Sequence, residues 1–148
     1  MLTLLLANTQ AELEPCLAIR HAVFCAERGV SPEIERDKGD VLNAGYDHFL
    51  LLSGETPVGA LRCRNPGGGT IQLQRFCILK EHRKSGLGRQ AVRLIEEHYR
   101  QNGISQIEMD AKFEVYGFYQ KCGYQTTGQP FEEAGIPHIK MIKRVTND

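Results

Sequence analysis

The sequence predicts an α+β fold built on one mixed, mostly antiparallel sheet. The middle of the chain carries short apolar runs between turn sequences rich in Gly and Pro, which is typical of an antiparallel meander. Segments on both sides of this region place apolar residues with helical spacing. The chain has 148 residues, which suits one domain with one core, and we expect that domain to span residues 1–148.

The elements are expected in the order β-α-β-β-β-α-β-α-β-β. An apolar run at the start gives the first strand, and a stretch of mixed charges after the first helix gives a long loop. The expected elements in chain order are a strand at 2–7, a helix at 10–26, a loop at 27–45, strands at 46–52, 57–64 and 70–79, a helix at 86–101, a strand at 104–110, a helix at 114–122, and strands at 124–128 and 138–145.

Capping residues set the expected ends of the helices. Thr9 and Glu12 have the spacing of a capping box, which opens the first helix. Pro15 lies too far into this helix to be a first-turn proline. It therefore suggests a later start for the helix, near Glu14. Asn102-Gly103 is typical of the end of a helix, and Gly123 is expected to end the short helix in the same way.

Turn residues divide the strands. Ser53–Thr56 and Asn65–Gly69 separate the three middle strands. In the third of these strands, Ile71, Leu73 and Arg75 alternate, so we expect them on one face. The segment between the last two strands holds Pro130, Gly135 and Pro137, and it is expected to be a loop.

Composition and charge exclude several classes of protein. Eighteen Lys and Arg balance 18 Asp and Glu, so the net charge is zero and nucleic acid is not an expected partner. No apolar run approaches the ~18 residues of a membrane span, and the first residues lack the basic region of a signal peptide. Five cysteines without C-x-x-C spacing indicate neither a disulfide framework nor a zinc ribbon. We therefore expect a cytoplasmic protein with no metal site and no membrane partner.

The segment Arg83–Gly88 is the strongest local signal for a ligand. It follows a strand and opens a helix, where unpaired backbone N–H groups favour anions. Glycines at 86 and 88 let the backbone approach a phosphate closely. Residues 80–93 include five basic side chains and one acidic side chain, so this part of a neutral chain is basic. The segment predicts a small polyanionic ligand.

Four interpretations of this segment are open on the residues alone. Gly88 is followed by Arg89 and Gln90, whereas a Walker A loop of a nucleoside triphosphatase needs Lys and then Ser or Thr. Residues 86–91 fit a G-x-G-x-x-A dinucleotide fingerprint, but six polar residues separate them from the preceding strand. The remaining interpretations are a site for the diphosphate of coenzyme A and an ordinary surface turn.

The sequence of a strand, R-x-x-G-x-G and a helix resembles the acyl-CoA signature of the GNAT N-acetyltransferase superfamily. Further motifs in chain order are similar to the small ElaA-like branch of that superfamily, and together they cover about residues 13–142. These motifs imply the GNAT fold. The motifs are Arg20–Phe24 with Glu27 and Glu35–Asp37, then Ala111-Lys112, Phe118–Tyr124, and Phe131–His138 with Met141.

The resemblance implies an enzyme that moves an acetyl group from acetyl-CoA to a primary amine by direct attack. The backbone at Arg83–Gly88 would bind the diphosphate, the strand end would pair with the pantetheine arm, and the N–H of Ile78 would polarise the thioester carbonyl. Tyr119 would protonate the leaving thiolate, because a phenol can donate to a thiolate of comparable basicity. The residues implied for the cofactor are Cys77, Ile78, Leu79, Arg83, Lys84, Ser85, Gly86, Leu87, Gly88, Arg89, Lys112 and Phe118.

The acceptor implied by the resemblance is a small-molecule or peptide amine, beside Glu27, Arg75 and His138. The general base is open among Glu27, His48, His82, Glu108 and His138, with a bound water as a further choice. Lys112 stands where the branch usually has Gln, Arg28 replaces another Gln, and Lys84-Ser85 replaces the commoner Gly-Lys. Homodimers are common in the superfamily, so a homodimer is also allowed. The alternative function is an acyl-CoA-sensing module that has lost transfer.

Overall fold

A seven-stranded sheet forms the centre of the computed structural model, which describes residues 1–146. Its strand order is β1-β2-β3-β4-β5-β7-β6, and every neighbouring pair is antiparallel except the parallel pair β4–β5. The predicted α+β fold with a mixed, mostly antiparallel sheet is therefore confirmed. The elements are β1 Leu2–Leu6, α1 Gln10–Arg20, the π-helix η1 His21–Glu27, α2 Pro32–Glu35, β2 Tyr46–Ser53, β3 Thr56–Arg64, β4 Thr70–Ile78, the 3₁₀ helix η2 Lys80–His82, α3 Leu87–Gln101, β5 Gln106–Lys112, α4 Tyr116–Lys121, β6 Gln125–Glu133 and β7 Ile136–Arg144.

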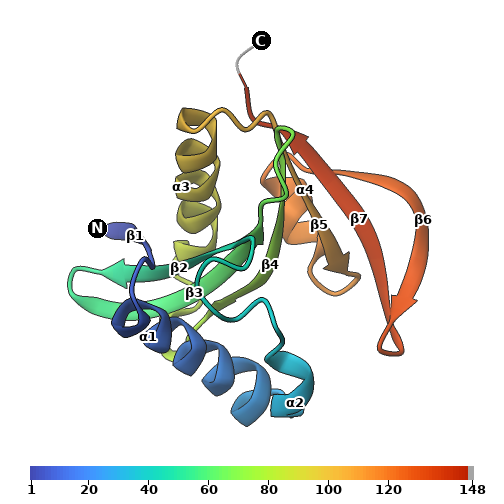
Figure 1. Cartoon of the computed structure of the whole chain (residues 1–148). Helices are drawn as coiled ribbons and strands as arrows, with labels where there is room; N and C mark the ends of the chain where they lie inside the picture. The colour runs from blue at the N-terminus through green and yellow to red at the C-terminus, as the bar shows by residue number, and fades with distance from the viewer. Residues whose placement is uncertain (147–148) are drawn as a thin grey trace.

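Helices lie on both faces of the sheet (Figure 1). The larger core cluster joins the apolar face of α3, including Ile95 and Tyr99, to inward residues of the strands such as Ile107, and side chains of α4 pack against its edge. The smaller cluster lies on the opposite face, where Leu13 and Cys16 of α1 pack against β2, β3 and β4. None of the helices in residues 1–146 has the length and hydropathy that a membrane span requires.

The N-terminal helix begins at residue 10, as its capping box predicts, and not at the later start that Pro15 suggested. The capping box is formed, since Thr9 Oγ1 accepts from the N–H of Glu12 and the Glu12 side chain accepts from the N–H of Thr9. The helix therefore begins at Gln10, with Pro15 inside it, and the predicted later start was wrong. The cap and the buried apolar side of α1 outweigh the roughly 3 kcal/mol cost of an interior proline.

Two segments predicted as loops contain regular structure. Pro32–Glu35 forms the short helix α2, which begins with a proline as first-turn prolines allow. The C-terminal strands are longer than predicted and meet at a tight turn, where Ala134 and Gly135 both have positive φ. Pro130 lies at an interruption of the β6–β7 register, where no ladder N–H is required. A proline-containing segment can therefore still be a strand.

Candidate active site

A slot opens between the two parallel strands at the centre of the sheet. Strands β4 and β5 pair only from Thr70↔Gln106 to Gln72↔Glu108, although β4 continues to Ile78 and β5 to Lys112. Beyond that point the two strands diverge (Figure 1). The edges that face each other across the slot thus have no ladder partner, and an extended ligand could pair with them.

A bulge in β4 marks the place where the strands separate. The β3–β4 register shifts between Ala60 and Arg62, and Arg75 of β4 has φ 55°. A bulge bends its strand and increases the local twist. Arg75 therefore leaves the alternation of Ile71 and Leu73, and the prediction that all three share a face was wrong.

The backbone of Ile78 points into the slot. The N–H of Leu79 donates to the Val58 carbonyl across β3–β4 at 2.8 Å. Because successive residues of a strand direct their backbone groups to opposite edges, the N–H and C=O of Ile78 face away from β3. Its carbonyl accepts from Arg83 Nε at 2.9 Å, which leaves the N–H for a ligand.

The segment Arg83–Gly88, called the anion loop from here on, has the backbone geometry that a phosphate site needs. Lys84 and Gly86 both have positive φ, 66° and 79°, and no side chain caps the N-terminus of α3. Within residues 1–146, the backbone N–H groups of residues 84–89 donate to no protein acceptor. Six consecutive donors and the positive end of α3 therefore lie together on the surface, which favours a bound anion.

An ion pair fixes this loop to the N-terminal half of the chain. Arg83 Nη1 and Nη2 donate to the two carboxylate oxygens of Glu27, at 2.6 and 2.7 Å. Glu27 lies at the end of η1, so the π-helix brings it to the loop. Hydrogen bonds from Arg83 lower the pKa of the Glu27 carboxyl. The structure thus joins Glu27 to the predicted cofactor loop.

Tyr119 and Phe118 of α4 lie beside the start of α3. A Cβ at Gly88 would be 3.2 Å from the Phe118 ring, so α3 and α4 approach each other closely here. The Tyr119 ring packs edge-on against Phe118 and Tyr124, at 5.1 and 5.9 Å between centroids. Burial, and then the neighbouring thiols of Cys122 and Cys63, raise the pKa of Tyr119 above its ordinary value. The phenol is thus held in its protonated form.

The three residues implied for the acceptor lie in different surroundings. Arg75 is half-buried and forms ion pairs with Glu35 at 3.3 Å and with Asp37 at 3.7 Å. His138 is buried in β7, with Nδ1 2.7 Å from the Ile136 carbonyl, and it lies opposite Lys112 of β5. No hydrogen bond or ion pair joins Glu27, Arg75 and His138 to one another in the part of the chain that the structure describes.

The other candidates for a general base divide by burial. His48 is buried, its Nε2 lies 2.9 Å from the Gly39 carbonyl, and burial lowers its pKa. His82 lies in the 3₁₀ helix that precedes the anion loop. Glu108 lies at the last position where β5 still pairs with β4, and its Oε1 is 3.6 Å from Lys140 Nζ. His48 therefore has the surroundings of a structural residue.

A buried cluster of ion pairs adjoins the slot and was not predicted as a site. Arg20 donates to Glu35 and Asp40, and Arg62 donates to Asp37 and Asp40. Arg62 also starts a row of hydrogen-bonded side chains that crosses the sheet to Asp110. The one sequence signal was Arg62 itself, a charged residue within the apolar strand 57–64.

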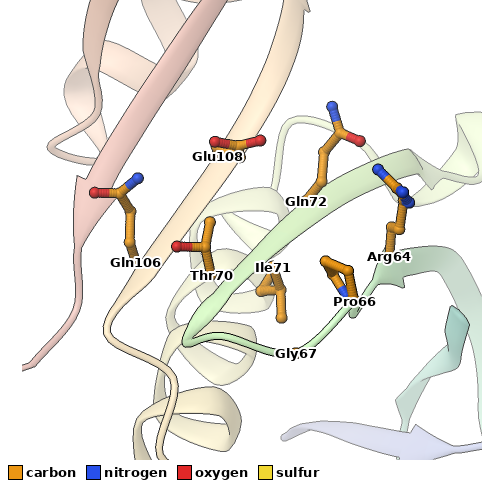
Figure 2. Close-up of a pocket in the computed structure, with 8 residues that line it drawn as sticks. All are labelled: Arg64, Pro66, Gly67, Thr70, Ile71, Gln72, Gln106 and Glu108. Atoms are coloured by element: carbon orange, nitrogen blue, oxygen red, sulfur yellow. The ribbon is translucent and has the colours of Figure 1, made fainter. Parts of the chain in front are cut away.

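The described surface includes two pockets. One of about 320 Å³ lies where β4 and β5 are still paired, and Figure 2 shows Gln72 of β4 and Glu108 of β5 on its wall. The other, of about 380 Å³, lies between α1, η1 and α2 and is lined by His21, Cys25 and Glu35 among others. Neither pocket is lined by the anion loop.

The fold resembles that of the GNAT acetyltransferases, and sequence comparison shows the family. The family model described as "Acetyltransferase (GNAT) domain" matches residues 24–145, and the chain belongs to this family. The uncharacterized protein YyaT of Bacillus subtilis is 40% identical over 95% of both chains. A crystal structure from Lactobacillus plantarum, described as a candidate N-acetyltransferase, has a TM-score of 0.89 at 30% identity and covers 97% of this chain and 98% of its own.

More distant solved structures share the fold. Escherichia coli ElaA has a TM-score of 0.81 at 21% identity, with 97% of this chain and 99% of its own covered. A Vibrio cholerae spermidine N-acetyltransferase, solved with CoA and spermine, has a TM-score of 0.76 at 14% identity, with 97% and 95% covered. An aminoglycoside 6'-N-acetyltransferase complexed with coenzyme A has the same TM-score at 15% identity, with 98% and 97% covered.

Proposed function

We propose that this chain transfers an acyl group, acetyl by default, from acyl-CoA to a primary amine by direct attack. The observation that carries the proposal is the open β4–β5 slot with the donors of residues 84–89 at its end. A slot with unpaired strand edges suits an extended amide-containing arm, and a row of N–H groups at a helix N-terminus suits its diphosphate. That two enzymes with this fold were solved with CoA supports the same ligand.

Named residues of this chain fit the donor. The backbone of Arg83–Arg89 would hold the diphosphate, and Cys77–Leu79 would pair with the pantetheine arm along the slot. Phe118 of α4, which lies beside the start of α3, and Lys112 at the end of β5 would line the walls of the slot. Acyl-CoA supplies the acyl group as a thioester. Lys112 stands where the ElaA-like branch usually has Gln. This difference leaves the backbone donors intact, because it changes a side chain only.

Two groups would act on the reacting atoms. The N–H of Ile78 faces the slot and would donate to the thioester carbonyl oxygen, where negative charge develops. The Tyr119 hydroxyl would give its proton to the leaving sulfur. Burial raises the pKa of Tyr119, so the phenol carries its proton before the acyl group is transferred.

A titration of the purified chain with acetyl-CoA, CoA, NADH and ATP tests the proposal. A ligand at 100 times its Kd adds about 2.7 kcal/mol of stability, which a thermal shift detects. We expect acetyl-CoA and CoA to stabilise the protein and NADH and ATP to have no effect. Release of CoA thiol in the presence of a panel of amines then measures transfer.

Three results would separate the alternatives. Stabilisation by NADH without stabilisation by acetyl-CoA would overturn the proposal in favour of a dinucleotide site. Tight binding of acetyl-CoA with no transfer to any amine would support an acyl-CoA-sensing module. Stabilisation by neither CoA species would identify Arg83–Gly88 as a structural turn.

A further inference from the structure

Asp110 lies at the point where the slot opens. The β4–β5 pairing ends at Gln72↔Glu108, and Asp110 is the next residue of β5 whose side chain lies on the same face as Glu108. It lies about 7 Å beyond Glu108 along the strand. Met109 and Ala111, its neighbours in β5, point to the opposite face and are buried in the larger core cluster.

A row of hydrogen-bonded side chains runs from Arg62 to Asp110. Arg62 Nε donates to Gln74 Oε1 at 2.9 Å. Gln74 Nε2 then donates to Gln72 Oε1 at 2.8 Å, and Gln72 Nε2 donates to Asp110 Oδ2 at 3.3 Å. A guanidinium can only donate, so it fixes the orientation of both amides. The row therefore ends by presenting an N–H to Asp110 Oδ2.

The second oxygen of this carboxylate is left without a donor. Asp110 Oδ1 is buried, and it has no hydrogen-bond partner among residues 1–146. The nearest cation is Lys140 Nζ of β7, at 3.8 Å from Oδ1 and 3.6 Å from the Glu108 carboxylate. Lys140 is shared between two carboxylates and is 41% exposed, so it does not saturate Oδ1. A buried oxygen without a donor is costly and points to a ligand that supplies one.

We infer that Asp110 is a catalytic residue that binds the ammonium group of the acceptor through Oδ1 and takes its proton. The inference rests on the proposed function, because it assigns the acceptor side of the same slot. A primary ammonium has the N–H donors that Oδ1 lacks, and the carboxylate neutralises its charge. Gln72, Gln74 and Arg62 are positioning residues, since they act on the acceptor through Asp110.

The step balances in protons and electron pairs. An N–H bond of the ammonium breaks, the proton passes to Asp110 Oδ1, and the electron pair stays on nitrogen. That pair forms the bond to the acyl carbon while the carbon–sulfur bond breaks, and the sulfur receives the proton of Tyr119. Nitrogen then gives up a second proton, which restores Tyr119, and Asp110 releases its proton to water.

Transfer from acetyl-CoA to ethylamine and to 2,2,2-trifluoroethylamine tests this assignment in Asp110→Asn. The fluorinated amine is far less basic and reaches the site already neutral. We expect Asp110→Asn to lower kcat/KM for ethylamine by about 10²-fold or more, the usual contribution of a positioned base. The loss for trifluoroethylamine should be about tenfold smaller than that for ethylamine. Saturation-transfer NMR should show ethylammonium on the wild-type complex with CoA and not on the Asp110→Asn complex.

Glu97→Gln is the control, since it also replaces a carboxylate with an amide, at an exposed position of α3 outside the slot. It should behave as the wild type with both amines. Lys140→Met tests the inference with Asp110 intact, because losing the competing cation should lower KM for ethylamine about two- to fivefold. Equal losses for both amines in Asp110→Asn, unchanged ethylammonium binding, or an unchanged KM in Lys140→Met would overturn the assignment. Failure of the wild type to bind CoA would instead contradict the proposed function.

Discussion

Tyr119 is the single side chain on which the proposed transfer depends most. Replacing it with Phe keeps the ring contacts with Phe118 and Tyr124 and removes only the hydroxyl. We expect Tyr119→Phe to lower kcat by about 10²- to 10⁴-fold, the range for a lost general acid. The Kd for acetyl-CoA, measured by calorimetry, should be unchanged. Full activity in this variant would exclude Tyr119 as the acid.

The raised pKa of Tyr119 also predicts a pH dependence. Burial disfavours the phenolate, so the hydroxyl keeps its proton above the ordinary tyrosine value of about 10. The rate of transfer should therefore show no loss from tyrosine ionisation between pH 7 and pH 10. A pH profile of kcat with saturating acetyl-CoA measures this, and a decline centred below pH 10 that is absent from Tyr119→Phe would contradict it.

Gly86 and Gly103 form a matched pair for testing the anion loop. Both have positive φ, 79° and 81°, and a Cβ at either meets no atom within 4 Å. Alanine at either position should therefore cost about 1–2 kcal/mol of stability through backbone strain. Only Gly86→Ala should also weaken acetyl-CoA binding, by about tenfold, or 1.4 kcal/mol. Equal Kd values for the two variants would show that the loop does not bind the ligand.

At the residue scale, the sequence could predict motif residues but not the acceptor side. Arg83, Gly86, Gly88 and Tyr119 belong to short patterns whose spacing is visible along the chain. Asp110 receives its hydrogen bond from Gln72, 38 residues away, and its role depends on that contact. Alternation along β5 predicts only that Asp110 faces away from the core.

At the scale of elements, the buried ion-pair cluster of α1, α2, β3 and β4 sets the stability of the N-terminal half. Arg62 and Asp40 are both almost fully buried, so removing Arg62 leaves a buried carboxylate with less compensation. We expect Arg62→Met to cost about 3–5 kcal/mol at pH 7, measured by urea unfolding. Arg36→Met, at an exposed position, should change stability by less than about 0.5 kcal/mol.

Acid should weaken the same cluster. Hydrogen bonds from Arg62 lower the pKa of Asp37, and for Asp40 the bonds from Arg20 and from the Asp37 N–H outweigh the opposing effect of burial. Carboxyls with lowered pKa stabilise the fold above the unfolded value of about 3.9, and this contribution is lost as the pH falls through the folded value. The loss of unfolding free energy in Arg62→Met, relative to the wild type, should therefore be smaller at pH 3 than at pH 7. An equal deficit at both pH values would contradict this.

The order of elements was predictable because each strand and helix carries its own periodicity and turn residues. The expected loop at 129–137 failed because Pro130 and Pro137 were interpreted as breaks in regular structure, whereas a bulge and the hairpin geometry accommodate them. The slot itself could not be predicted. It results from a bulge at Arg75 and from the end of pairing at Gln72, and both depend on how β3 and β5 pack on either side of β4.

At the scale of the whole molecule, a chain with zero net charge separates its charges into distinct sites. The basic segment 80–93 surrounds the anion loop, while the acidic residues 35, 37 and 40 are used within the buried cluster beside the slot. The total charge therefore does not describe the local sites. Both regions adjoin β4, since the anion loop follows β4 in the chain and Arg75 of β4 forms ion pairs with Glu35 and Asp37.

Hydrogen exchange of the whole chain with and without acetyl-CoA tests this arrangement most directly. The proposed function predicts that added acetyl-CoA slows exchange at the N–H of Ile78 and at residues 84–89, which have no protein acceptor in the structure. The amides of the pocket at Gln72 and Glu108, where β4 and β5 are already paired, should change little. Protection confined to that pocket, or no protection at 84–89 under saturating acetyl-CoA, would contradict the placement of the donor in the slot.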